Sequence, residues 1–151
     1  MPITQDILQE WSDFRTKQLW TKEVNKIFEI NKQSIIELMR HYYQGPKIQY
    51  LTLERTIQIF TADGMLNERD ARHVYAMGKM PCTHETKEIA NMQKVLNSAE
   101  LMEMIGRAAD IKYKEDSTLR LAEKIEKLLH PLFKMTGAAV ISPLGVADVN
   151  E

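Results

Sequence analysis

The sequence predicts an all-α fold of about six to eight helices, and three observations lead to this prediction. Apolar residues recur at helical spacing in most segments of the chain, which gives each segment one apolar face. Residues that cap helix N-termini stand before several of these segments. Glycine and proline mark boundaries between them, as at residues 45–46. Together these features indicate short amphipathic helices joined by turns.

Length and composition limit the class of protein. The 151 residues suffice for one domain with its own core, and 44% apolar and 27% charged residues are typical of globular chains. A net charge of −1 gives no electrostatic reason to expect nucleic acid or a membrane surface as partner. Cys82 is the single cysteine, and no apolar run approaches the ~20 residues that span a bilayer. We therefore expect a cytoplasmic protein.

Residues 1–20 are expected to form an N-terminal amphipathic helix. Ile7, Trp11 and Phe14 fall on one face, and Asp6 lies in the first turn, where the helix dipole favours negative charge. This helix either packs on the body of the domain or docks a partner through Trp11. The first alternative is favoured because such apolar stripes usually face a core.

The next helices are predicted near residues 21–30 and 34–43, or as one bent helix. Residues 31–32 interrupt the apolar pattern. Ser34 and Glu37 then have the spacing of a capping box, in which the hydroxyl and the carboxylate each satisfy a free backbone amide.

After the glycine-proline stop at residues 45–46, helices are predicted at 52–62 and 67–78. Thr52 and Asn67 stand where an N-cap is needed. A brief apolar alternation before Thr52 suggests a short strand.

The region of residues 81–95 is polar and weakly patterned, and we expect a long loop with one short helix. Asn97 and Glu100 form a second capping-box pattern. The stripe that follows predicts a helix over 97–113.

The last helix is predicted within residues 114–136, with Ser117 as its cap. Pro131 should kink or divide it, because proline removes one backbone donor. Gly137 is predicted to end the helix, because glycine favours the backbone conformation that follows a helix C-terminus. Residues 137–151 are small and interrupted by glycine and proline, so we expect an extended tail that is either mobile or ordered by a partner.

The order of the central helices carries a family resemblance. Two helix–loop–helix units follow one another, and Leu51 and Leu96 would be the matching loop centres of a short antiparallel contact, each followed by a capping residue. Residues 21–113 therefore resemble a paired EF-hand of the calmodulin-like family. They are also similar to degenerate members of that family in ciliary and cytoskeletal proteins. The resemblance implies paired hands at the centre, flanked by additional N- and C-terminal helices.

The resemblance does not extend to calcium. An EF-hand loop needs oxygen ligands at five positions and a bidentate glutamate at the last. Neither loop offers more than one carboxylate, so we expect no bound metal and no cofactor. The ligand positions of the first loop would hold Gln44, Pro46, Ile48, Thr52 and Arg55. Those of the second would hold Ile89, Asn91, Gln93, Asn97 and Glu100.

No sequence motif indicates catalysis. The histidines at 41, 73, 84 and 130 form no metal-binding pair at helical spacing. Cys82 and His84 supply at most two of the four ligands of a structural zinc. Phosphate-binding loops and nucleophile elbows are absent from the sequence. We expect a protein that is not an enzyme.

These observations favour a non-catalytic protein–protein interaction module or a structural subunit of a larger assembly, cytoskeletal or ciliary by resemblance. A calcium-sensing EF-hand protein is the alternative. The expected partner is a helical or extended protein segment, rather than nucleic acid or membrane. Each candidate partner-binding residue could equally be a core residue. The candidates are Trp11, Met39, Tyr42, Phe60, Met102, Met104 and Ile105.

Overall fold

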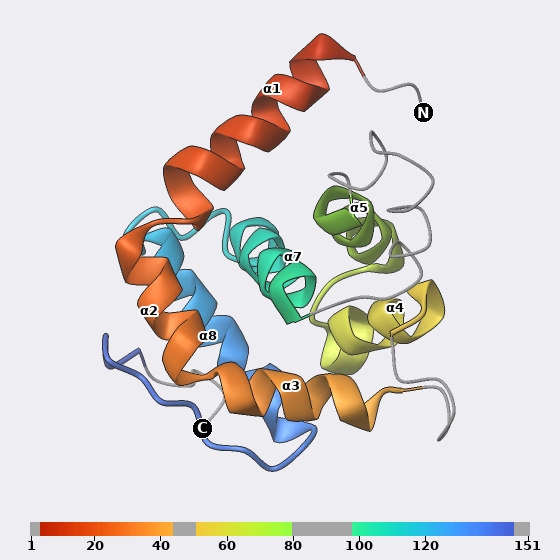
Figure 1. The fold of residues 1–151 in the computed structure, drawn as a ribbon, viewed down its shortest axis with the longest axis vertical. Coiled ribbons are helices and arrows are strands. Elements are labelled where there is room, and N and C mark those ends of the chain that lie inside the picture. Colours follow the sequence, from red (N-terminus) through yellow and green to blue (C-terminus); the bar gives the residue numbers. More distant parts are fainter. Residues whose placement is uncertain (1–3, 44–50, 80–97, 147–151) are drawn as a thin grey trace.

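The computed structural model describes residues 4–43, 51–79 and 98–146, and these ranges contain helices and turns but no strand (Figure 1). The predicted all-α class is therefore confirmed. A π-helical turn, Phe14–Leu19, continues the first helix, and a 3-10 turn, Ala62–Gly64, follows the fourth. The helices are α1 (Gln5–Asp13), α2 (Lys22–Ile30), α3 (Lys32–His41), α4 (Leu53–Thr61), α5 (Glu68–Lys79), α7 (Ser98–Lys112) and α8 (Leu121–Lys134).

Several predictions lie outside the described residues. These are the short strand before Thr52, the loop and short helix of residues 81–95, the capping role of Asn97 and the contact of Leu51 with Leu96. The pairing of two EF-hand loops therefore stays a prediction.

Four helices begin at a side-chain cap that the local sequence supplies. The oxygens of Thr4, Thr21, Thr52 and Asn67 each accept a hydrogen bond from the amide three residues further along, at 2.8–3.3 Å. These bonds satisfy amides that have no partner inside the helix. The predicted caps Thr52 and Asn67 are confirmed.

The break between α2 and α3 corrects the predicted capping box. α3 begins at Lys32 with Asn31 as its N-cap residue, so Ser34 lies inside the helix rather than at its start. Asn31 closes α2 and opens α3, and its side chain hydrogen-bonds elsewhere instead of capping. The backbone amide of Ile35 already bonds to the carbonyl of Asn31, at 3.1 Å, which extends α3 toward its N-terminus.

The last helix begins later than predicted and is not divided. Arg120, rather than Ser117, is the N-cap residue of α8, and its backbone amide donates to the Glu123 carboxylate at 3.0 Å. Pro131 lies within the last turn of a continuous α8. A proline this close to the C-terminal end removes one hydrogen bond but leaves the preceding turns intact.

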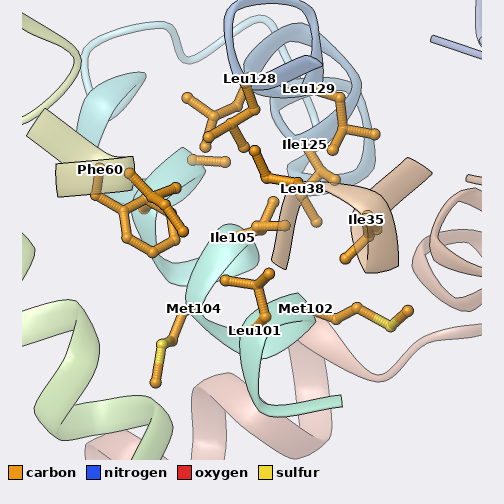
Figure 2. Close-up of a cluster of buried hydrophobic side chains, with 14 of the residues drawn as sticks. Ile35, Leu38, Phe60, Leu101, Met102, Met104, Ile105, Ile125, Leu128 and Leu129 are labelled. Atoms are coloured by element: carbon orange, nitrogen blue, oxygen red, sulfur yellow. The ribbon is translucent and has the colours of Figure 1, made fainter. Parts of the chain in front are cut away.

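The hydrophobic core surrounds α7, which lies between the other helices in Figure 1. Every residue of α7 from Leu101 to Ala109 is buried. A helix that is covered on all sides is typical of the centre of a domain. Figure 2 shows α3, α4 and α8 contributing to the same cluster as α7. Its members include Ile35, Leu38, Phe60, Leu101, Ile105, Ile125, Leu128 and Leu129.

Two glycines allow the close approach of neighbouring elements to α7. A Cβ atom on Gly106 would lie 2.2 Å from Cδ1 of Leu19 in the π-helical turn. One on Gly78 of α5 would lie 2.5 Å from Cγ of Met104. Both distances are shorter than packed side chains permit, so the absence of a side chain sets how tightly these elements pack.

Candidate functional site

A cleft of about 320 Å³ lies between α1, α5 and α7. α1 supplies one wall because its apolar face turns toward the body of the domain, as its helical spacing predicts. The opposite walls come from α5, from His73 to Met77, and from α7, from Arg107 to Ile111. The apolar lining residues are Ile7, Trp11, Phe14, Met77 and Ile111.

Trp11 holds α1 in place across this cleft. Its indole N–H donates to the carbonyl of Met77, at 2.9 Å, which joins α1 to the end of α5. Its own backbone carbonyl accepts from Nη2 of Arg107, at 3.2 Å, which joins α1 to α7. The side chain is half-buried, so part of the ring remains available to a ligand.

An ion cluster lies next to Trp11, and two of its side chains, Glu103 and Arg107, are buried. The Glu103 carboxylate is 3.2 Å from both Nη2 and Nε of Arg107, and 3.0 Å from Nε of Arg15. The Arg15 Nε is close enough to form an ion pair but makes no aligned hydrogen bond. The Arg107 guanidinium lies 4.9 Å from the ring centre of Phe14, and that of Arg15 lies 5.2 Å from Trp11. Two cations thus share one carboxylate and the faces of two aromatic rings.

The polar lining of the cleft holds two carboxylates, one guanidinium and one imidazole. Glu10, His73, Arg107 and Asp110 reach it. Burial raises the pKa of Asp110, against the smaller lowering effects of Lys124, Arg107 and Lys114. Burial also lowers the pKa of Arg107, opposed by Glu103. Arg107 is paired with Glu103, a carboxylate that it shares with Arg15. Glu10 and the partly buried Asp110 are the acidic groups of the lining that an incoming cation can approach.

The predicted partner-binding residues do not meet in one groove. Trp11 lines the cleft, whereas Tyr42 is half-buried near the end of α8 and its hydroxyl donates to Sδ of Met135 at 3.1 Å. Met102 is 7% exposed and borders a separate hollow between α2 and α7. The remaining four candidates lie in the core and are 0–4% exposed: Met39, Phe60, Met104 and Ile105. Figure 2 labels the last three of them. A partner could contact these four side chains only if the helices separated.

None of the polar residues that line the cleft was among the sequence candidates. No sequence motif singles out Asp110, and His73 belongs to no metal-binding pair at helical spacing. The usable signal was Glu103 and Arg107, a charged pair four residues apart inside the otherwise uncharged run of residues 101–109. Such a pair on a buried face needs a partner or a function.

The candidate calcium ligands are mostly outside the described residues, as are Cys82 and His84. Of the described ones, Thr52 caps α4, the Arg55 guanidinium donates to Gln58 at 3.1 Å, and Glu100 pairs with Lys79 at 2.9 Å. Within the described ranges, no three histidine, cysteine or acidic side chains gather in a metal-binding arrangement.

Comparison of the chain with protein-family models, with curated proteins and with solved structures found no match. Among the described helices, none has the length and apolar character to cross a membrane.

Proposed function

We propose that this chain is a non-catalytic protein–protein interaction module, or a structural subunit of a larger assembly, that works without calcium. The observation that carries the proposal is the cleft between α1, α5 and α7. It combines apolar walls with the carboxylates of Glu10 and Asp110. A partly open cleft of this composition suits a side chain presented by another protein.

The partner that fits is a helical segment with one large apolar anchor and a nearby lysine or arginine. The anchor would lie against Trp11, Met77 and Ile111, and the cation would approach Glu10 and Asp110. A cation near Asp110 would offset the unfavourable desolvation of that carboxylate. Apolar anchors in desolvated pockets supply most of the affinity of such interfaces, and rim charges supply specificity.

The EF-hand resemblance is part of the same proposal. The succession of α3, α4, α5 and α7 agrees with two helix–loop–helix units, and α5 packs on both α4 and α7. Leu51, at the proposed centre of the first loop, is 2% exposed. Apolar packing of this kind would set the angle between the hands in place of metal. A cytoskeletal or ciliary assembly in the cytoplasm is the setting that the resemblance suggests.

Selection of peptides from a helical display library tests the proposal. We expect the selected peptides to share an apolar anchor beside a basic residue. Glu10→Lys should weaken their binding about tenfold or more, because it replaces an attractive rim charge with a repulsive one. Glu37→Lys is the matched control, since Glu37 is also an exposed helical glutamate but lies on α3.

Peptides that bind both variants equally would contradict the use of this cleft. Binding that required micromolar calcium and was lost with a chelator would support the calcium-sensing alternative instead.

A further inference from the structure

The segment of residues 138–146, here called the strap, returns along the chain's own helices after α8. Gly137 has a φ of +72°, a conformation that favours glycine, and turns the chain out of the helix. In Figure 1 the strap passes beside α3 and α2, on the side of the molecule away from α1. The sequence suggested a mobile tail or one ordered by a partner, whereas this part is held by contacts within the chain.

The side chain of Asn31 binds the backbone of the strap. Asn31 is 1% exposed, and its side-chain amide nitrogen donates to the carbonyl of Ile141 at 2.9 Å. Its amide oxygen accepts from the backbone N–H of the same residue, also at 2.9 Å. Both backbone groups of Ile141 are thereby paired, as they would be in a sheet.

Glu126 provides the second anchor. It is fully buried in α8, and its carboxylate accepts from the hydroxyl of Ser142, from the amide of Leu144 at 2.8 Å and from the amide of Val146 at 3.2 Å. In the described part of the chain, its hydrogen-bond donors all come from the strap. A buried carboxylate needs such donors, so the strap and Glu126 depend on each other.

Hydrogen bonds to Asn31 and Glu126 therefore provide much of the attachment of the strap. Ile141 is 57% exposed, so its side chain adds little apolar burial. A ring nitrogen of His130 lies 2.8 Å from the carbonyl of Val146 and adds another polar contact. Ala138, Val140 and Leu144 also pack against the core. Three of the strap's hydrogen bonds nevertheless end on one buried carboxylate, so this attachment is sensitive to negative charge placed beside that carboxylate.

Ser142 is followed by Pro143, and this is the only serine-proline or threonine-proline pair in the 151 residues. We propose that Ser142 is a phosphorylation site for a proline-directed serine/threonine kinase, and that its phosphorylation releases the strap from Glu126. In the transfer, the Ser142 hydroxyl oxygen bonds to the γ-phosphorus of ATP, whose bond to the β–γ bridging oxygen breaks. ADP leaves, and the hydroxyl proton passes to the kinase's base.

The modification acts on Glu126 in two ways. It removes the hydroxyl donor that the carboxylate now uses. It also adds about −1.5 to −2 charges at neutral pH directly against a buried negative group. The strap can avoid this repulsion by moving away from α8, which uncovers Asn31 and Glu126.

The test uses the full chain, a purified proline-directed kinase and magnesium-ATP. Mass spectrometry should find one phosphate on Ser142 in the native chain and no phosphate at that position in Ser142→Ala. A synthetic peptide of residues 137–151 confirms that the kinase is active. Modification of the peptide but not of the full chain would overturn the proposal.

Hydrogen exchange then measures the release. After phosphorylation, the amides of Ile141, Leu144 and Val146 should exchange about tenfold faster or more, while those of α7 stay unchanged. The loss of the hydroxyl alone, in Ser142→Ala, should have a smaller effect. Unchanged protection of the strap in the phosphorylated chain would overturn the proposal.

Glu126→Gln tests whether the negative charge of Glu126 repels the phosphate on Ser142. Because the amide carries no charge, phosphorylation should accelerate exchange less in this variant than in the native chain, each relative to its own unphosphorylated form. An equal acceleration of exchange in both chains would show that repulsion by the Glu126 charge does not release the strap.

Discussion

At the scale of single residues, the chain contains two glutamate–arginine pairs with the same spacing in very different surroundings. Glu103 and Arg107 are buried in α7, with side chains 3% and 9% exposed. Glu68 and Arg72 are exposed on α5, at 67% and 53%. The comparison separates the effect of burial from that of sequence spacing.

Glu103→Gln should lower the free energy of unfolding by about 3 kcal/mol, because it leaves the buried Arg107 charge without its carboxylate. Glu68→Gln, the matched control, should cost less than about 1 kcal/mol, as exposed pairs usually do. Urea unfolding of both variants measures the difference. Equal losses would mean that the Glu103 cluster is not desolvated.

The raised pKa of Asp110 makes its contribution to stability depend on pH. An acid whose pKa is higher in the folded state is less favourable for folding when ionised, and this penalty disappears as the pH falls below its ordinary value of about 4. Asp110→Asn should therefore be more stable than the native chain near neutral pH, with the difference shrinking toward pH 4. Thermal melting across this range measures it. A variant less stable at neutral pH would show that the interactions with Lys124 and Arg107 outweigh burial.

At the scale of the elements, caps could be predicted from the sequence where a side chain acts on its own helix. Thr52 and Asn67 needed no knowledge of the rest of the molecule. The start of α3 was predicted wrongly because Asn31 is occupied by the distant Ile141, and a local pattern does not contain that contact. The last residue of the π-helical turn, Leu19, packs beside Gly106, and this distant contact is likewise absent from any local pattern.

Gly106→Ala should destabilise the protein by about 1–3 kcal/mol, although alanine favours helices more than glycine does. The added methyl group would meet Leu19, which is fully buried. Denaturant unfolding measures the loss. In a Leu19→Ala background the same change should cost less, because the space is then available, and an equal cost in both backgrounds would contradict this contact.

At the scale of the whole molecule, α7 connects two different surfaces. One side bears the cleft with α1 and α5, and α8 carries the strap on the other. The all-α class and most helices could be predicted from periodicity. The cleft could not, because it exists only once Trp11 has docked on Met77 and Arg107, residues that are 66 and 96 positions away. The sequence left the candidate methionines open between a partner surface and the core for the same reason, because a helical stripe does not show which side is covered.

The central claim is that the cleft between α1, α5 and α7 receives a protein partner without calcium. The most direct measurement is photo-crosslinking in cells, with p-benzoylphenylalanine in place of His73, an exposed residue at the cleft, or of Lys26, an exposed residue on α2. We predict a partner that is crosslinked from position 73 and not from position 26, in equal amount with calcium and with a chelator. Crosslinks that are the same from both positions, or that appear only with calcium, would contradict the claim.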